Sequence, residues 1–415
     1  MTGTSSNPDH RFWVPVAVSL FAIAWGGNEF TPLLTMYRLD QGFSDVVVDT
    51  LLFAYVLGIV PALLLGGPLS DRWGRRALMV PAPLVAIAGS AVLAAGSDHA
   101  AVLIGGRLLS GVSLGLAMAV GGSWLTELSR APFEPGAAAG AGPRRVAMSL
   151  TAGFGVGAGV AGVLAEWGPW PSGFPYLFHI VVTAAGFVWL LGVPETRVDI
   201  PADKRTAPLR EDLRIPSVAH RRFWLVVVPL APWVFGAAAS AYAILPALMS
   251  ERVSSAPIAF SALLCLIALG CGFGIQALGR RIDRPGSARS SITAFGLLIV
   301  ALPLAAWASL TLSIPVVVLA AAVLGMGYGM ALVSGLLEVQ RIATPDDLAG
   351  LNAVFYSLSY LGFAVPVTMA VASSWLSYPV MFLVGMTVAV MCLLLVLLGS
   401  RRPRAVKEGW EEVSG

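Results

Sequence analysis

Residues 46–76 read VVVDTLLFAYVLGIVPALLLGGPLSDRWGRR, an apolar segment that leads directly into an arginine-rich loop. The apolar part, residues 46–66, has the length of about 20 residues that a helix needs to cross the hydrocarbon core of a bilayer. A membrane-spanning strand would be about half as long and would alternate in polarity. The stretch therefore predicts a transmembrane helix followed by a short loop outside the bilayer.

Eleven further blocks of this kind occupy the rest of the 415-residue chain, which is 57% hydrophobic and only 12% charged. Ordinary soluble domains are roughly a quarter charged, so the composition excludes a soluble fold. Backbone groups find no water inside a bilayer, and segments of this length must therefore be helices. We expect an all-α polytopic membrane protein with twelve transmembrane helices. The predicted spans are residues 13–37, 46–66, 77–96, 101–127, 145–166, 175–193, 222–249, 256–278, 289–309, 313–338, 349–373 and 378–399.

The basic residues predict the orientation of these spans. Of the 26 Lys and Arg residues, 23 fall on one side, Arg38 and Arg252 fall on the other, and Arg107 lies within a span. Cytoplasmic loops collect Lys and Arg, so both termini of this multi-pass protein are expected in the cytoplasm. High Ala, Gly and Arg usage suggests a bacterial inner membrane. The positive loops predict anionic lipids as neighbours and no nucleic acid as a partner.

Three matching pairs of segments indicate that the chain contains two similar halves. The pairs are residues 67–74 with 279–286, Glu127 and Arg130 with Glu338 and Arg341, and residues 32–38 with 246–252, at offsets of 212, 211 and 214. Each half holds six spans, so both copies insert in the same direction. The predicted domains are a first six-helix bundle at 1–193, a cytoplasmic linker at 194–221, a second six-helix bundle at 222–400 and a cytoplasmic tail at 401–415.

The loop at residues 67–76, GPLSDRWGRR, resembles the best-known signature of the major facilitator superfamily, and residues 279–286 resemble its degenerate second copy. Residues 191–197 (LGVPETR) resemble that family's ending of the first half, and residues 107–115 (RLLSGVSLG) its helix 4 motif. The resemblance covers nearly the whole chain. It implies a twelve-helix secondary transporter, similar to drug/proton antiporters, with a cavity lined by helices 1, 4, 7 and 10. The fifth span lacks the proline of the GPxxGG motif that exporters of the family often carry, which leaves the direction of transport open.

The charged loops predict a latch at the cytoplasmic side. Asp71 and its neighbouring arginines can bond helix ends and Glu127, while the glycines allow close helix approach and a turn. Breaking such contacts would bias alternating access. The alternative is that the arginines merely follow the positive-inside rule, which does not require Asp71 or Asp283. The predicted gating residues are Gly67, Asp71, Arg72, Gly74, Arg75, Arg76, Glu127, Arg130, Glu195, Arg197, Gly279, Asp283, Arg284, Glu338 and Arg341.

Two charged side chains stand out inside the predicted spans, Glu29 and Arg107. At 1.5 Å per residue they lie roughly 12 and 9 Å from the outer face, and charges within membranes are expensive and usually functional. We expect Glu29 to take up and release the coupling proton, with Asn28 and Arg107 tuning it. The alternative is a Glu29–Arg107 ion pair that only fixes helix packing.

The second half offers neutral polar side chains instead of charges. These are Tyr242, Tyr328, Asn352, Tyr356 and Tyr360. An apolar and aromatic lining of this kind suits an amphipathic or drug-like molecule better than a sugar. Tyrosines at helical spacing can equally serve packing alone.

Other classes of function find little support. Neither lysine follows a glycine, which argues against a phosphate-binding loop and ATP hydrolysis. The histidines, including His179, are scattered along the chain, which argues against a metal site, a cofactor or an enzyme. The tails are short for a membrane sensor. We expect a monomer that moves a small organic molecule by alternating access, most simply by proton-coupled efflux; metabolite uptake by proton symport or uniport is the alternative.

Overall fold

The protein is described here from a computed structural model that covers residues 11–198, 208–284, 287–344 and 346–400. The predicted tail at 401–415 and residues 199–207 of the predicted linker lie outside the described residues. Within the described ranges every regular element is a helix, which confirms the all-α prediction.

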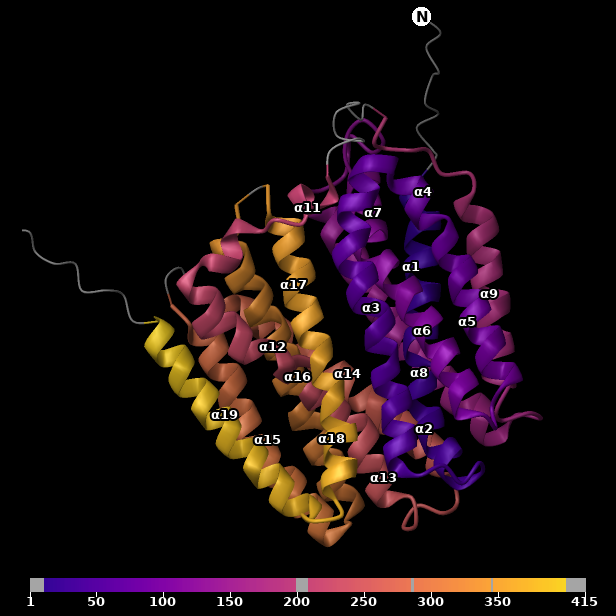
Figure 1. Cartoon of the computed structure of the whole chain (residues 1–415), viewed down its shortest axis with the longest axis vertical. Helices are drawn as coiled ribbons and strands as arrows, with labels where there is room; N and C mark the ends of the chain where they lie inside the picture. Colours follow the sequence, from indigo (N-terminus) through magenta and orange to yellow (C-terminus); the bar gives the residue numbers. More distant parts are fainter. Residues whose placement is uncertain (1–10, 199–207, 285–286, 345, 401–415) are drawn as a thin grey trace, which may run out of the picture.

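Between residues 11 and 198, nine α-helices form the described part of the first half (Figure 1). They are α1 (Trp13–Asn28), α2 (Phe30–Leu39), α3 (Asp45–Trp73), α4 (Arg75–Met79), α5 (Pro81–Ala95), α6 (Ala100–Leu116), α7 (Gly122–Leu128), α8 (Ala141–Trp167) and α9 (Phe174–Leu190). A π-helical segment, η1 (Ala117–Gly121), joins α6 to α7. The pairs α1–α2, α4–α5 and α6–α7 each occupy one predicted span.

The second half follows the same plan. Its elements are α11 (Leu209–Asp212), η2 (Pro216–Ala219), η3 (Phe223–Val227), α12 (Val228–Ala239), η4 (Ser240–Ile244), α13 (Leu245–Met249), α14 (Pro257–Ile282), α15 (Arg289–Thr311), α16 (Ile314–Ile342), α17 (Leu348–Tyr360), η5 (Leu361–Phe363), α18 (Ala364–Ala372) and α19 (Tyr378–Ser400). The segments from η3 to α13 occupy the seventh predicted span, and those from α17 to α18 occupy the eleventh.

Ten helical segments in the described ranges are long and apolar enough to cross a membrane. The other two predicted spans are the shorter apolar helix α9 and the pair α1–α2, which is interrupted at Glu29. Pro32 explains the interruption, because a proline has no N–H to donate to the carbonyl of Asn28 four residues earlier. The first span is therefore divided at the residue expected to carry the proton.

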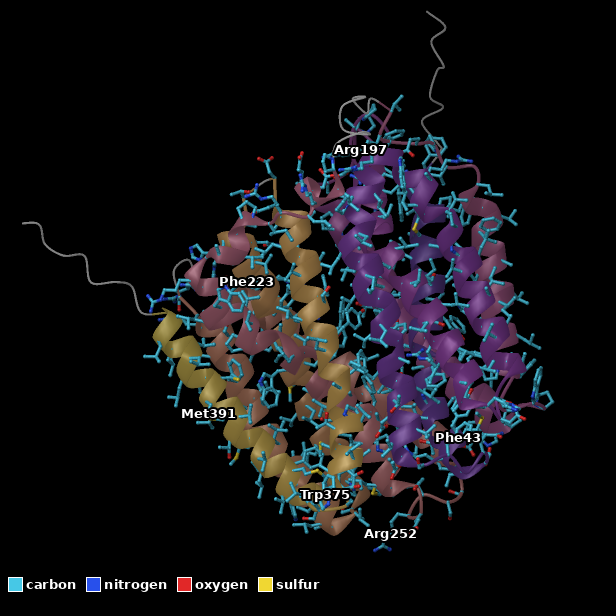
Figure 2. The ribbon with its side chains drawn as sticks, viewed as in Figure 1. Phe43, Arg197, Phe223, Arg252, Trp375 and Met391 are labelled. Atoms are coloured by element: carbon cyan, nitrogen blue, oxygen red, sulfur yellow. The ribbon has the colours of Figure 1, made fainter. Side chains whose placement is uncertain are left out.

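The flanks of the molecule are apolar, as a surface facing lipid must be. Val181 and Val188 are each 68% exposed and Leu310 is 70% exposed. In Figure 2, Arg197 lies at one end of the molecule, and Phe43, Arg252 and Trp375 lie at the other. We call the end with Arg197 and α11 the linker end, and the other the opposite end.

Two groups of helices, coloured indigo to magenta and rose to yellow in Figure 1, stand side by side. One apolar core lies mainly in the first group and includes residues of the second such as Tyr242 and Tyr360, and the other core lies within the second group. The groups meet toward the opposite end, where α14 packs against α8 and α2 and α18 packs against α3. The domain boundaries after residues 193 and 221 stay predictions.

The same close helix contact occurs in both halves. A Cβ atom added to Gly111 of α6 would lie 2.2 Å from the backbone oxygen of Tyr55 in α3. One added to Gly329 of α16 would lie 1.9 Å from the oxygen of Gly272 in α14. Glycine lets helix backbones approach this closely within a membrane. The predicted repeat thus appears as a repeated packing of the second span on the fourth and of the eighth on the tenth.

Candidate functional site

A cavity of about 1800 Å³ lies between the two groups of helices and extends to the linker end. Its inner end is lined by Asn28, Thr31 and Arg107 from the first half, and by Tyr242 and Phe363 from the second. Charged side chains such as Glu127, Arg130 and Asp212 line it near the linker end. The space exceeds the roughly 300–1,000 Å³ of ordinary small-molecule pockets.

The structure brings most of the predicted substrate residues to this cavity. Asn28, Arg107, Tyr242, Tyr328, Asn352 and Tyr356 all line it. Glu29 is not among the lining residues and is fully buried. Its place behind the cavity wall could not be read from its height along the helix, since height does not specify which way a side chain points.

Five aromatic side chains of the second half stack into one surface, which we call the aromatic wall: Phe235, Tyr242, Tyr328, Tyr360 and Phe363, all lining the cavity. The ring centroids of Phe235 and Tyr360 are 4.4 Å apart, and those of Phe235 and Phe363 are 5.1 Å apart. Aromatic residues combine large apolar area with a preferred stacking geometry. Phe235 and Phe363 were missed from the sequence, because a phenylalanine in an apolar span looks the same whether it faces lipid or a cavity.

Arg107 lies between two rings at the inner end of the cavity. Its guanidinium carbon is 4.4 Å from the ring centroid of Phe30 and 4.2 Å from that of Tyr55, within cation–π range. Nε donates to the backbone oxygen of Leu51 at 3.3 Å, whereas Nη1 has no partner among the described residues. No ion pair within 4.0 Å joins Arg107 to Glu29 in the described part of the chain.

Glu29 instead joins a buried group that we call the Glu29 cluster: Glu29, Ser90 of α5 and His179 of α9. Ser90 Oγ is 3.0 Å from Glu29 Oε1 and 2.8 Å from His179 Nδ1. His179 Nδ1 lies 3.5 Å from Glu29 Oε1. His179, which the sequence showed only as one of several scattered histidines, thus lies beside the buried carboxyl. A distance of 150 residues along the chain hid the contact.

Asn28 connects the two halves beside the break between α1 and α2. Its Nδ2 donates to the backbone oxygen of Phe154 at 2.9 Å and to Cys265 Sγ of α14 at 3.5 Å. Its Oδ1 accepts from the hydroxyl of Thr31 at 2.7 Å. The neighbour of Glu29 in the chain therefore contacts both halves.

At the linker end, Arg75 is the centre of the first-half charge network. Its guanidinium donates to Glu127 at 2.9 Å, Asp71 at 2.9 Å and Ser70 at 2.6 Å. Glu127 also accepts from the hydroxyl of Thr196. These contacts tie the loop between α3 and α4 to the end of α7.

Glu195 joins the same network through backbone N–H groups at the start of α4. Its carboxylate accepts from the backbone N–H of Arg75 at 3.1 Å and of Arg76 at 2.8 Å, which satisfies the start of α4. Gly74, with φ of +95°, turns the chain there, and an added Cβ would lie 2.5 Å from Glu195 Oε2. Arg76 donates to the carbonyls of Leu191 and Val193 after α9, at 2.7 and 2.6 Å.

The remaining first-half gating residues have separate positions. Arg197 lies 3.2 Å from Asp71, and Arg72 Nε donates to Asp212 of α11 at 2.6 Å. Arg130 lines the cavity. A Cβ atom added to Gly67 would meet nothing within 4 Å, so close helix approach does not explain that glycine.

In the second half, Glu338 and Arg341 of α16 form the corresponding network. Arg341 pairs with Asp283, and its Nη1 donates to Glu338 at 2.6 Å. Glu338 also accepts from Arg222 at 2.8 Å. Arg284 contributes its backbone oxygen to Arg341 at 3.2 Å. The other predicted residue, Gly279, packs tightly, since an added Cβ would lie 2.5 Å from a side-chain carbon of Val333.

The linker also contacts the second half outside the spans. The N–H of Ser217 donates to Asp347 Oδ2 at 2.9 Å, and the N–H of Thr344 donates to Asp347 Oδ1 at 2.7 Å. Burial disfavours the ionised carboxyl, but these hydrogen bonds outweigh it and lower the pKa of Asp347. The linker is thus held to the start of α17 by a carboxylate that is charged at neutral pH.

Comparison with known proteins agrees with this architecture. The sequence profile described as Major Facilitator Superfamily matches residues 16–366. A chloramphenicol resistance protein of Pseudomonas aeruginosa is 26% identical over 262 residues, which are 63% of this chain and 60% of that protein. The glucose transporter GlcP of Staphylococcus epidermidis is 35% identical over 96 residues, which are 23% of this chain and 20% of that protein. The chain thus spans less than two thirds of the length of these curated relatives.

Among solved structures, a POT family transporter in complex with 5-aminolevulinic acid superimposes with a TM-score of 0.74 at 15% identity, covering 96% of this chain and 97% of that chain. At this level of identity the likeness shows the fold alone.

Proposed function

Because this chain belongs to the major facilitator superfamily, and is therefore a secondary transporter of a small molecule, we propose that it exports an amphipathic, drug-like organic compound in exchange for protons. The observation that carries the proposal is the combination of an aromatic wall on the second-half side of the cavity with a buried carboxyl, Glu29, next to the first-half lining residue Asn28. The first suits an apolar compound and the second suits a proton.

The proposal places the linker end in the cytoplasm of a bacterium, since the basic loops lie there. The cavity reaches that end, while the helix contacts at the opposite end separate it from the outside. A compound would enter from the cytoplasm and rest on the aromatic wall. The protein would act as a monomer. The hydrogen bonds of the charge networks around Arg75 and Arg341 would rearrange when the cavity closes at the linker end and opens at the opposite end.

Coupling would act through the break between α1 and α2. Protonation of Glu29 removes a charge next to Asn28, and Asn28 contacts α8 and α14. A change at this point alters the contact between the halves on which alternating access depends. The compound and the proton would thus favour different arrangements of α1 and α2, so that binding of one would weaken binding of the other.

The test is compound-dependent proton movement in proteoliposomes of known protein orientation under an imposed proton gradient. A panel of lipophilic and sugar-like compounds is added, and the internal pH is followed. We expect lipophilic compounds to move protons in the wild type and not in Glu29→Gln. Asp98→Asn is the matched control, because Asp98 is an exposed acid that contacts the neighbouring His99. Unchanged proton movement in Glu29→Gln would overturn the proposal.

Arg107 favours a second candidate, the uptake of an aromatic organic anion by proton symport. Its Nη1 lacks a partner, and the guanidinium lies at the inner end of the cavity. An anion beside Arg107 would repel an ionised Glu29, so anion and proton would bind together. Cooperative binding of this kind belongs to symport and not to exchange. Uniport remains the outcome if a compound equilibrates without moving protons.

Arg107→Gln distinguishes the two candidates. If the substrate is an aromatic carboxylate held by Arg107, its KM should rise about 10- to 100-fold, as expected for loss of a charged hydrogen bond. A neutral amide of the same shape should keep its KM. Equal effects on carboxylate and amide would exclude the symport candidate. Transport of radiolabelled pairs of such compounds provides the measurement.

A further inference from the structure

The Glu29 cluster places three polar side chains from three helices in one hydrogen-bonded row. Their side chains are buried, with Glu29 at 0% and Ser90 and His179 at 1% exposure. Neither Ser90 nor His179 lines the cavity. Gly26 of α1 makes room for the imidazole, because an added Cβ would lie 2.5 Å from its ring. The row is separated from the cavity, and the positions of its hydrogens decide the charges of Glu29 and His179.

One ring nitrogen can be assigned from its acceptor. His179 Nε2 is 2.9 Å from the backbone oxygen of Ala22, and a carbonyl oxygen can only accept a hydrogen bond. Nε2 must therefore carry a hydrogen. The hydroxyl of Thr183, 2.9 Å from the same nitrogen, can accept or turn to another partner. The protonation state of the histidine is then decided at Nδ1 alone.

Ser90 has a single hydrogen and lies between two groups that both can accept. If it donates to Glu29, it must accept from Nδ1–H, so His179 is the cation and Glu29 is ionised. If it donates to Nδ1, Glu29 must be protonated and donate to Ser90, and His179 is neutral. Both arrangements satisfy the row, and both contain the same number of protons.

Removing that proton leaves the row unsatisfied. An ionised Glu29 and a bare Nδ1 would then face each other at 3.5 Å with one hydroxyl hydrogen between them. Buried acceptors without donors are costly, and more so when one is charged. The geometry therefore favours one shared proton.

We propose that His179 is a second holding place for the coupling proton, and that the Ser90 hydroxyl relays the proton between His179 and Glu29. In the transfer, the Nδ1–H bond breaks as a new Ser90 O–H bond forms, while the old Ser90 O–H bond breaks and a Glu29 O–H bond forms. The net charge of the row does not change. The inference rests on the proposed function of Glu29 and adds two residues to it.

Other ionisable groups lie near the row. Arg107 of α6 lies close enough for its charge to act on Glu29, and Tyr37 of α2 and Tyr176 of α9 are ionisable groups that lie close enough to be affected by a charge on Glu29. The two tyrosine hydroxyls bond each other at 2.9 Å. On α8, the charged residues lie near the helix ends, where Glu166 accepts from the N–H of Ile258 at 2.8 Å. Arg107 is thus the charged neighbour of the row on another helix.

The experiment compares the pH dependence of compound-driven proton movement in wild type, His179→Gln and Ser90→Ala. Ser90→Ala removes the hydroxyl hydrogen that an ionised Glu29 accepts, so it should move the midpoint of the profile about 1 pH unit or more toward higher pH. His179→Gln removes the second group that can hold the proton and the bare acceptor that faces an ionised Glu29, so it should move the midpoint toward lower pH. Ser90→Thr, which keeps the hydroxyl, should restore the wild-type profile. Ser113→Ala is the matched control, since Ser113 is equally buried and donates to Ala82 of α5 at 2.7 Å, away from the row.

A second readout separates the inference from the proposed function. The carboxylic acid C=O band of Glu29, identified by its loss in Glu29→Gln, is titrated by infrared spectroscopy in the purified protein. Its midpoint should shift in His179→Gln and Ser90→Ala. If Glu29→Gln abolishes proton movement while both variants keep the wild-type midpoint, the inference fails and the proposed function stands. If Glu29→Gln retains proton movement, the proposed function fails, and the infrared midpoints alone decide whether the row shares its proton.

Discussion

Arg75→Ala is expected to destabilise the protein by about 3 kcal/mol, because it removes the partner of two carboxylates from a largely buried site. The Arg75 side chain is 8% exposed and donates to Glu127, Asp71 and Ser70. After the substitution, Glu127 keeps the hydroxyl of Thr196 and the more distant charge of Arg130 but loses its hydrogen-bonded cation. The effect is measured as the change in unfolding free energy or melting temperature of the protein purified in detergent.

Arg144→Ala is the matched control for Arg75→Ala. Arg144 also lies at the linker end of the first half, but it is exposed. An exposed charge without such contacts should change stability by no more than about 0.5 kcal/mol. If both substitutions lower the stability equally, general loop charge would explain the arginines, as the positive-inside alternative holds. A specific effect of Arg75 would support its role as a latch.

Gly162→Leu is expected to prevent the opposite end from closing. Gly162 of α8 faces Ala262 of α14, and an added Cβ would lie 2.3 Å from the Cβ of Ala262. Nearby, Glu166 accepts from the N–H groups of Ile258 and Ala259 at 2.8 and 3.0 Å, which ties the end of α8 to the start of α14. Overpacking costs about 1–3 kcal/mol, equivalent to roughly a 5- to 150-fold shift between conformations.

Spin labels in place of Asp40 and Trp375 report the separation of the halves at the opposite end. In Gly162→Leu the distance distribution should move to longer values than in the labelled parent. Gly155→Leu is the control on the same helix, because an added Cβ there would lie 3.9 Å from Leu266, an ordinary contact. If Gly162→Leu and Gly155→Leu give identical distance distributions, the contact between α8 and α14 does not determine whether the opposite end is closed.

Much of the architecture could be predicted because a membrane restricts what a sequence can do. The bilayer fixes the length and type of each span, so the helices α3, α8 and α16 were evident from apolar runs alone. The contact of Arg75 with Glu127 followed from charge and from position at helix ends. The break at Glu29 was predictable in principle, since Pro32 marks it, but the break was overlooked.

The arrangement around Glu29 could not be predicted, because it depends on which way side chains turn around each helix. His179 has no neighbour in sequence that marks it as a partner of Glu29. Phe235 and Phe363 carry no polar atom that separates a cavity wall from a lipid surface. Hydropathy specifies depth in the membrane, while rotation about the helix axis is decided by packing between helices far apart in the chain.

The division of residue types between the halves has a consequence for how such a protein changes over generations. Glu29, Ser90, His179 and Arg107 all belong to the first half, whereas the aromatic wall belongs entirely to the second. Under the proposed mechanism, the residues that handle the proton and the aromatic rings that contact an apolar compound are inherited on separate halves, although Asn28 and Thr31 of the first half also line the cavity. Mutations that broaden or narrow the range of tolerated compounds can then collect on α12 and α17 while the energy source is preserved. A lineage confronted with a new toxic compound could thus change the aromatic side of the cavity and leave the proton-handling residues as they are.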